Sequence, residues 1–242
     1  MQLQAKQAEV EHKNGLLEGL VEQREWLLRE VHHRVKNNLQ IIISLLQAQG
    51  RYLSDEAALH AIHQSEHRVW TMALIHQKLY RSDTLSTIDV PAYLREVVEQ
   101  LGESFDATDR IGFDFQCEPL ELDVVQAVPL GLIVNEAVTN ALKYAFPGGR
   151  PGTVRLSLHH LDPQQCELVV EDDGVGLPPA LDLERSRSMG SQIMFGLSRQ
   201  LEGDLRVESR GGVKVTLSFR ASGLLTGPAA GLVRRAGQAE PA

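Results

Sequence analysis

The chain has 242 residues, which corresponds to one large domain or two small ones at about 150 residues per domain. Hydrophobic residues make up 43% and charged residues 23%, an ordinary globular composition that excludes wholesale disorder and collagen-like repeats. The net charge of −8 gives the chain no electrostatic footprint for a nucleic-acid backbone or an anionic membrane, so we expect no nucleic-acid partner.

Two features of the composition bear on location. The only cysteines, Cys117 and Cys166, cannot form a disulfide framework, which fits a reducing compartment and predicts a cytoplasmic protein. No apolar run approaches the ~18–20 residues that a membrane span needs, and the first residues lack the apolar core of a signal peptide. We therefore expect no membrane span in this chain.

Proline divides the sequence into two parts. Residues 1–81 contain no proline, whereas all ten prolines lie from Pro91 onward. Because proline is expelled from helix interiors, the first third is predicted to form long helices and the remainder a mixed domain with turns.

The first part reads as a helical lead-in followed by a helical hairpin. Leucine and valine recur every seven residues over 1–25, a weak coiled-coil pattern. An apolar stripe over 26–49 and a second one over 56–80 flank a break at 50–55, which predicts an antiparallel hairpin over 26–81. One hairpin buries its stripes poorly, so we expect a homodimer through residues 26–80, as a four-helix bundle.

The second part alternates strand and helix patterns irregularly. After a linker at 82–87, we expect one domain over 88–220 with a buried helix over 125–146 and a closing strand hairpin over 205–219. Hairpins of this kind favour an α+β layer over a doubly wound parallel sheet. The Gly-, Ala- and Pro-rich residues 221–242 are predicted to be a disordered tail.

The first segment with chemical character is Glu30-Val-His-His-Arg-Val-Lys-Asn-Asn-Leu-Gln40. At about 100° per residue, His32 falls at the edge of the apolar stripe and His33 falls almost opposite its centre. We therefore expect His32 to be structural and His33 to be held outward on a rigid helix. A neutral imidazole is a nucleophile at neutral pH, although most surface histidines are solvated and idle.

Three further segments are weak signals when each is taken alone. Glu136 and Asn140 lie four residues apart on one helix face, where an amide oxygen can ligate Mg²⁺, a carboxylate can accept a proton, and Lys143 can counter phosphate charge. Glu171-Asp-Asp-Gly-Val-Gly176 ends a strand in acids and glycines, and Ser188-Met-Gly-Ser-Gln192 opens a helix that suits phosphate. Taken alone, the three segments could equally be an ordinary polar helix face, an ordinary turn and an ordinary helix cap, in that order.

In this order, the four segments resemble the sensor histidine kinases, whose ATP-binding fold is shared with gyrase-type ATPases. The H-R-x-K-N-N-L-Q box at 33–40 is similar to that of the HWE-related branch with the second type of dimerisation and phosphoacceptor domain. The resemblance covers roughly residues 26–219. It implies an α+β protein in which a helical-hairpin dimerisation and phosphoacceptor domain precedes an α/β-sandwich ATP-binding domain.

The resemblance assigns roles residue by residue. His33 matches the phosphoacceptor, Asn140 the Mg²⁺-ligating asparagine, and Glu136 stands where gyrase-type relatives carry an acid. Asp172 looks like the aspartate that binds the adenine amino group. Gly174, Gly176 and Gly190 match the glycines that line the nucleotide, and Lys143, from its charge and its place on the helix, is expected to counter phosphate charge there.

The chain departs from the pattern at two places. The HWE group proper carries a histidine where this chain has Tyr144 and a later Trp-x-Glu, whereas the only tryptophans here are Trp26 and Trp70, which indicates the sister branch. Ser188-Met-Gly-Ser is a sparse version of the lid motif, which weakens the assignment of phosphate contacts there.

The implied function is an ATP- and Mg²⁺-dependent histidine kinase that phosphorylates His33 and passes the phosphoryl group to an aspartate of a response regulator. One alternative is a non-catalytic phosphotransfer scaffold with a decayed nucleotide domain; another is a serine kinase or ATPase on the same fold. Sensor domains such as PAS are absent from these residues, so the input would come from a longer protein or a separate upstream partner.

Three more histidines have a spacing that resembles a metal site. His60, His63 and His67 follow one another at i, i+3 and i+7. They lie opposite the apolar stripe of their helix, so we expect a solvated polar face rather than a zinc site.

Overall fold

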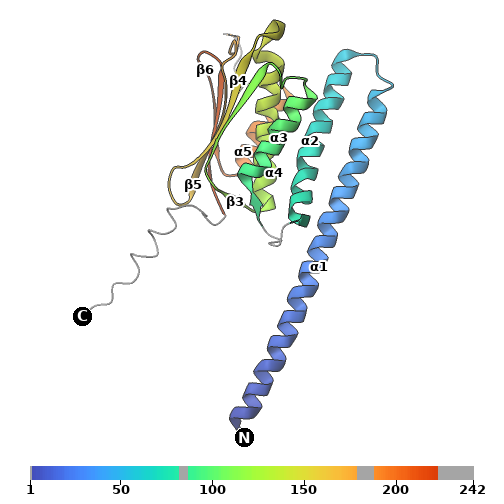
Figure 1. Ribbon diagram of the computed structural model, residues 1–242, viewed down its shortest axis with the longest axis vertical. Coiled ribbons are helices and arrows are strands. Elements are labelled where there is room, and N and C mark those ends of the chain that lie inside the picture. Colours follow the sequence, from blue (N-terminus) through green and yellow to red (C-terminus); the bar gives the residue numbers. More distant parts are fainter. Residues whose placement is uncertain (1, 82–86, 179–187, 223–242) are drawn as a thin grey trace, which may run out of the picture.

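The computed structural model describes residues 2–81, 87–178 and 188–222, and its two longest helices pair as a hairpin (Figure 1). Helix α1 spans Gln2–Gly50 without a break, so the predicted lead-in over 1–25 continues directly into the hairpin. Helix α2 spans Glu56–Arg81, and the carboxylate of Asp55 caps it by accepting from the backbone N–H of Ala58 at 2.9 Å. The predicted break at 50–55 is therefore confirmed, with α2 beginning directly after it.

The second part combines short helices with a mixed sheet. Its elements in chain order are β1 (Ile88–Asp89), α3 (Val90–Ser104), β2 (Ile111–Cys117), β3 (Glu121–Leu122), α4 (Val124–Asn140), a π-helix (Ala141–Ala145), a 3₁₀ turn (Pro147–Gly149), β4 (Gly152–His160), β5 (Gln165–Asp172), α5 (Met189–Gln200), β6 (Asp204–Ser209) and β7 (Val213–Arg220). The strands and helices predicted from the sequence are all present, which confirms the α+β class.

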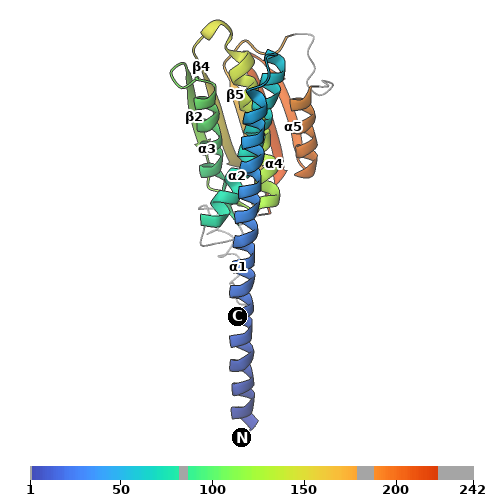
Figure 2. The ribbon, with the colours of Figure 1, turned by 90° about the vertical axis from the view of Figure 1, so that its right-hand side faces the viewer.

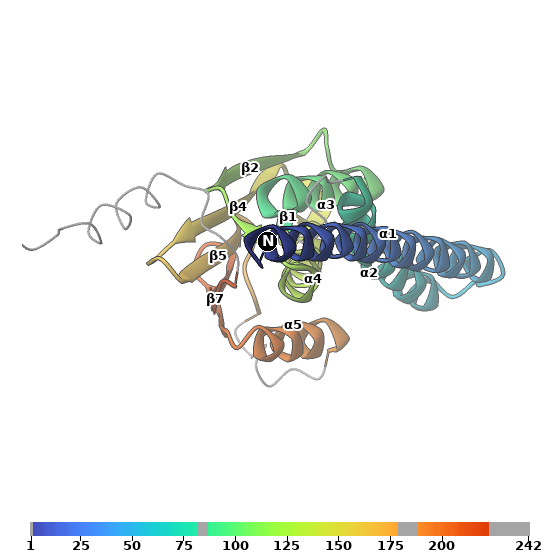
Figure 3. The ribbon, with the colours of Figure 1, turned by 90° about the horizontal axis from the view of Figure 1, so that it is seen from below.

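Five strands form one sheet in the order β2-β4-β5-β7-β6, and β1 pairs with β3 separately. Only β2 and β4 run parallel; the other neighbours are antiparallel. Viewed from below, helices α3, α4 and α5 cover the same face of this sheet (Figure 3). The register pairs Val154 with Asp172, which places the end of β5 beside the start of β4.

Helix α4 is the centre of the domain. Asp123 caps its start by accepting from the backbone N–H of Gln126 at 2.9 Å, and twelve of its seventeen residues are buried. The sequence predicted one helix as far as residue 146, but the α-helix ends at Asn140 and continues as a π-helix over Ala141–Ala145. A π-helical turn widens the helix by one residue, and such turns often occur at functional sites.

One helix in the described ranges is long and apolar enough to cross a membrane, namely the continuous stretch Val124–Ala145 with a mean hydropathy of 1.2. The sequence analysis expected no such segment. Most of this stretch, 72%, is buried inside the protein, where its apolar side chains face the sheet and the neighbouring helices. Its hydropathy is thus accounted for by its place in the core.

Helix α2 shares that core. Its side chains Leu74, Ile75 and Leu79 are buried in the same hydrophobic cluster as Tyr93 of α3 and Val138 of α4. Two perpendicular views show α2 between α1 and the mixed domain (Figures 1 and 2). The predicted division into a domain over 26–81 and a domain over 88–220 therefore follows the sequence pattern, whereas the packing joins α2 to both.

Helix α1 keeps one apolar face toward α2 and a second one exposed. Ile43 is buried against the hairpin partner, and the predicted stripe residues Leu28, Val35, Leu39 and Leu46 are half-buried, whereas Ile42 is exposed. Since α1 has 49 residues and α2 has 26, nearly half of α1 extends beyond its partner. The exposed apolar side chains of α1 are Leu16, Leu17, Leu20, Val21, Trp26, Leu27, Val31, Ile41, Ile42 and Leu45.

Two predicted segments lie largely outside the described residues. The linker is described only at Thr87, and the tail only at Ala221 and Ser222. Both of these tail residues are hydrogen-bonded: the Ala221 N–H donates to the Gln164 carbonyl at 2.9 Å, and the Ser222 hydroxyl donates to Gln126 Oε1 at 2.6 Å. The ordered domain therefore extends two residues beyond the predicted boundary at 220.

Candidate nucleotide and phosphoacceptor site

Asp172 is fixed at the end of β5 by two backbone groups. Its Oδ1 accepts from the N–H of Gly174 at 2.9 Å and from the N–H of Val213 at 3.3 Å, which joins the end of β5 to the start of β7. Burial of this side chain raises its pKa, and the two backbone hydrogen bonds oppose that shift. Because both bonds use Oδ1, Oδ2 keeps its lone pairs for a donor from a ligand.

The turn after Asp172 lies against the π-helix. The N–H of Val175 donates to the Ala145 carbonyl at 3.0 Å, and a side chain at Gly174 would overlap Ala145. Gly176 has a φ of 75°, a conformation that glycine adopts without strain. These glycines thus bring the strand end that carries Asp172 against the segment that follows Asn140.

Asn140 and Lys143 mark the transition from α4 to the π-helix. The Asn140 side chain is half-exposed and does not cap the following turn. Lys143 is half-buried, with its Nζ 5.9 Å from the centre of the Phe105 ring. Burial lowers the pKa of Lys143, the nearby Glu136 carboxylate raises it, and the Arg68 guanidinium lowers it.

This donor set fits a nucleotide that brings its own magnesium. Asn140 offers one amide oxygen, Lys143 a positive charge and Asp172 an acceptor for an amine, while Mg²⁺ in such sites keeps most of its ligands from phosphates and water. No group of three or more His, Cys, Asp or Glu side chains within residues 2–81, 87–178 and 188–222 is placed to hold a metal ion.

Glu136 is buried and paired with a residue that the sequence analysis did not single out. The Arg68 guanidinium of α2 donates from Nε to Glu136 Oε1 at 2.6 Å and from Nη2 to Oε2 at 3.0 Å. The two side chains are 10% and 3% exposed. A signal for this contact was present, because Arg68 stands on the same helical face as Thr71, Ile75 and Leu79, where a lone charge needs a partner.

Helix α5 completes this cluster. The Arg68 Nη1 donates to the sulfur of Met189 at 3.4 Å, and an added Cβ at Gly190 would lie 2.8 Å from Glu136 Oε2. The missing side chain at Gly190 therefore lets the first turn of α5 approach the carboxylate. Ser188 caps α5 by accepting from the N–H of Ser191 at 3.3 Å. Gly190 thus contacts Glu136, and its predicted role beside the nucleotide stays a prediction.

The two adjacent histidines of α1 face different surroundings, as their wheel positions predicted. His33 is exposed, with Asn37 Nδ2 at 3.4 Å from its Nδ1. His32 is half-buried, with its Nδ1 3.0 Å from Nδ1 of His76 on α2. Burial lowers the pKa of both His32 and His76, which favours the neutral rings. A hydrogen bond between the two Nδ1 atoms, with one as donor and the other as acceptor, ties α1 to α2.

The structure does not bring His33 to the nucleotide residues. Helix α1 packs on α2, and α2 packs on α4, so the helix with His33 is separated from α4 by a full helix (Figures 1 and 2). The turn after Asp172 contacts the π-helix that follows Asn140 and carries Lys143, Glu136 faces Arg68 of α2, and His33 lies on α1, the outer helix of the hairpin. Phosphoryl transfer requires a different arrangement of the two parts, or a second copy.

The prediction for His67 was wrong. His60 and His63 are exposed, as expected, but His67 is half-buried with its Nε2 2.7 Å from the Ser104 hydroxyl and its ring 5.6 Å from that of Phe105. Burial is the main cause that lowers its pKa. The packing of α3 against this end of α2 takes His67 out of the polar face, which a wheel drawn for a single hairpin could not show.

Comparison with known families agrees with this two-part organisation. Residues 30–105 match the family described as histidine kinase. Residues 125–223 match the family described as histidine kinase-, DNA gyrase B- and HSP90-like ATPase. The first match contains the hairpin with His33, and the second contains α4, the Asp172 turn and α5.

Individual relatives are of the same kind. The sensor histidine kinase PdtaS of Mycobacterium tuberculosis is 36% identical over 186 residues, which are 74% of this chain and 36% of PdtaS. Blue-light-activated histidine kinase 2 of Erythrobacter litoralis is 31% identical over 189 residues, 76% of this chain and 54% of that protein. The chain thus spans about a third to a half of the length of these relatives.

A solved structure has the same architecture. The histidine kinase domain of the Erythrobacter litoralis EL346 blue-light activated histidine kinase superposes with a TM-score of 0.62 at 28% identity, covering 82% of this chain and 92% of that domain. The hairpin and the mixed domain are therefore both parts of a known fold.

Replacing Asp172 by Asn is expected to weaken ATP binding by at least about tenfold, because the amide presents a donor where a carboxylate accepts from the adenine amine. Isothermal titration calorimetry measures the change. Asp173→Asn is the matched control, since Asp173 Oδ1 accepts from the Thr153 N–H at 2.8 Å and an amide oxygen can do the same. Equal ATP affinity of Asp172→Asn and the unmodified protein would refute this role.

Proposed function

Since the chain belongs to the histidine kinase family, in the branch with the second type of dimerisation and phosphoacceptor domain, we propose that it is an ATP-dependent kinase that phosphorylates its own His33. The observation that carries this proposal is the exposed His33 on a hairpin whose second helix packs directly on an ATPase-type domain. In that domain the turn that follows Asp172 contacts the π-helix Ala141–Ala145, which carries Lys143 and directly follows Asn140.

The proposed reaction is an in-line transfer. A neutral ring nitrogen of His33 forms a bond to the γ-phosphorus of ATP, and the bond from that phosphorus to the bridging oxygen of ADP breaks. Asp172 holds the adenine, Lys143 neutralises phosphate charge, and Mg²⁺ bound with Asn140 would neutralise more of it. Glu136 orients the imidazole or accepts its proton once the two parts have rearranged.

The phosphoryl group would then pass to an aspartate of a response-regulator receiver domain, as in other two-component systems. The alternative, a phosphotransfer scaffold with a decayed nucleotide domain, is disfavoured because Asp172, Asn140 and the turn glycines keep their chemistry and packing. We further propose a cytoplasmic location and an upstream sensor, either in a longer protein or in a separate partner.

His33 is predicted to be the labelled residue. Incubation with γ-labelled ATP is expected to label the protein, and His33→Gln should abolish the label because it removes the only nucleophile proposed. His60→Gln, a change at another exposed histidine, should leave labelling intact, and His32→Gln should retain measurable labelling. Normal labelling of His33→Gln would show that the assignment is wrong.

Glu136 is predicted to act in the chemical step more than in binding. Glu136→Gln keeps the size of the side chain and should reduce the single-turnover rate of His33 phosphorylation by about 10²-fold, the usual scale for a positioned acid–base group. Asn140→Ala should instead lose the Mg²⁺-dependent part of nucleotide affinity, because it removes the protein ligand of the metal.

Titration of a fluorescent ATP analogue with and without Mg²⁺ separates these two effects. If Glu136→Gln loses affinity as severely as Asn140→Ala, then Glu136 is a structural or metal-site residue and its catalytic role is refuted.

We also propose that the chain forms a homodimer through residues 26–80. The apolar side chains of α1 that do not face α2, such as Leu27, Val31 and Leu45, form an exposed face along the hairpin, and a second hairpin would cover it. Light scattering at micromolar concentration is expected to give twice the chain mass. A Leu27→Glu/Leu45→Glu variant should give the single mass; a single mass for the unmodified protein would contradict the proposal.

A further inference from the structure

The contact between α2 and α4 contains a buried charge pair at the point where the proposed chemistry needs a free carboxylate. Arg68 binds both oxygens of Glu136, and both side chains are almost completely removed from solvent. Each oxygen keeps a further acceptor site, but the side chain is only 3% exposed and the first turn of α5 lies directly against Oε2, so a nucleophile or a metal-bound water has no open approach to the carboxylate. In this arrangement Glu136 is therefore withheld from the reaction.

Neighbouring contacts fix the position of Arg68 along α4. The Thr71 hydroxyl, one turn after Arg68, accepts from Asn135 Nδ2 at 3.0 Å, and the Tyr93 hydroxyl donates to the Thr71 carbonyl at 3.3 Å. On the other side, Met189 and Gly190 of α5 close over the pair. The pair is thus enclosed by three helices and can open only if α2 and α4 move relative to each other.

We propose that Arg68 is a positioning residue that holds Glu136 in a resting arrangement, and that phosphorylation of His33 requires this pair to open. The inference rests on the proposed kinase function. It explains why the same structure both occupies Glu136 and separates His33 from the nucleotide residues: one docking contact of α2 on α4 does both.

The pair has the properties of a two-state contact. Breaking it locally would leave two unpaired buried charges, which is strongly unfavourable, whereas moving the hairpin as a unit returns both charges to water. Buried interfaces of this kind have discrete arrangements rather than a continuous range. Lys143 adds a second cation near Glu136, so the carboxylate has an alternative partner on its own helix once Arg68 leaves.

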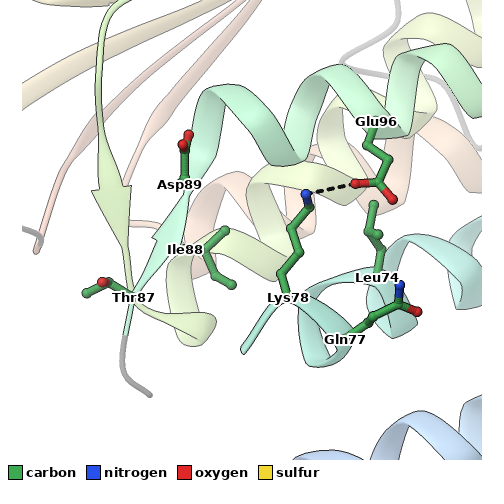
Figure 4. A pocket seen from close by; sticks show the side chains of 7 residues that line it. All are labelled: Leu74, Gln77, Lys78, Thr87, Ile88, Asp89 and Glu96. Atoms are coloured by element: carbon green, nitrogen blue, oxygen red, sulfur yellow. Dashed lines mark ion pairs between the residues drawn. The ribbon is translucent and has the colours of Figure 1, made fainter. Parts of the chain in front are cut away.

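The test compares three variants of the full chain. Arg68→Met removes the charge and keeps an apolar stem, and Arg68→Lys keeps the charge but loses the two-pronged geometry. The matched control is Lys78→Met, which breaks the pair between Lys78 Nζ and Glu96 Oε2 at 2.7 Å. The Lys78–Glu96 pair likewise joins α2 to a neighbouring helix, in this case α3. It lies apart from the Arg68–Glu136 pair and lines a separate cavity of about 320 Å³ beside β1 (Figure 4).

The first measurement is the autophosphorylation rate at varied ATP concentration. Because opening the pair frees a group for the chemical step, Arg68→Met should raise kcat by at least about fivefold, the lower end of typical coupling between sites. The KM for ATP should stay within about twofold, Arg68→Lys should fall between Arg68→Met and the unmodified protein, and Lys78→Met should match the unmodified protein. If Arg68 were needed only for folding, the Arg68→Met replacement would instead lower kcat or raise the KM for ATP.

The second measurement does not depend on kinase activity. Trp70 lies on α2 two residues after Arg68 and packs against the core, and the one other tryptophan, Trp26, is exposed. In a Trp26→Phe background, acrylamide quenching of Trp70 therefore reports docking of α2. Arg68→Met should increase the quenching constant clearly above that of Lys78→Met.

The outcomes separate the two proposals. A kcat for Arg68→Met equal to or below that of the unmodified protein overturns the resting-state role, whether Trp70 remains shielded or becomes accessible. If the unmodified protein does not label at all, the proposed kinase function fails, and the Trp70 measurement still decides whether Arg68 holds the docked arrangement: equal quenching of Arg68→Met and Lys78→Met overturns it.

Discussion

Helix α4 must be buried on nearly every side, and the arrangement of the sheet and of the other helices follows from how they pack around it. Twelve of its seventeen residues are buried, and no single sheet can bury a helix all round. The sheet covers one face, α3 and α5 flank it, and α2 closes the remaining face with Leu74, Ile75 and Leu79. The second helix of the hairpin is therefore part of the core of the ATPase-type domain.

This constraint explains the ion pair. Glu136 points from α4 toward α2 and its side chain is only 3% exposed, so its charge can be tolerated only with a close and geometrically complete partner. Arg68 supplies that partner with two hydrogen bonds to the two carboxylate oxygens. The carboxylate on the buried face of α4 and the arginine on the facing side of α2 therefore depend on each other for their burial.

The sequence was sufficient for features that depend on local pattern. The 3.6-residue period, the absence of proline before Pro91 and the turn glycines located the helices, the strands and the Asp172 turn, and the wheel separated inward His32 from outward His33. Each of these is a property of one segment and its immediate neighbours in the chain.

Features that depend on contacts between distant segments were missed. Arg68 meets Glu136 across 68 positions, and His67 meets Ser104 across 37. The helical period shows that Arg68 lies on a buried face, but local pattern does not identify the distant partner of either residue. The π-helix over Ala141–Ala145 also went unpredicted, because the Asp172 turn that packs against it lies some thirty residues further along the chain. Tertiary packing decided all three.

The same packing sets a conflict between stability and chemistry. Docking α2 on α4 buries apolar side chains and a charge pair, and it also places α2 between His33 and the nucleotide residues. If the proposed kinase function holds, the reaction rate would reflect the population of an arrangement in which α2 has left α4. Helix α1 is continuous and is tied to α2 through His32 and His76. Because no flexible segment interrupts it, a displacement of its long N-terminal half is transmitted to the hairpin. The contact of Arg68 with Glu136 and the contact of His76 with His32 are both made by α2, so this one helix joins α1 to α4.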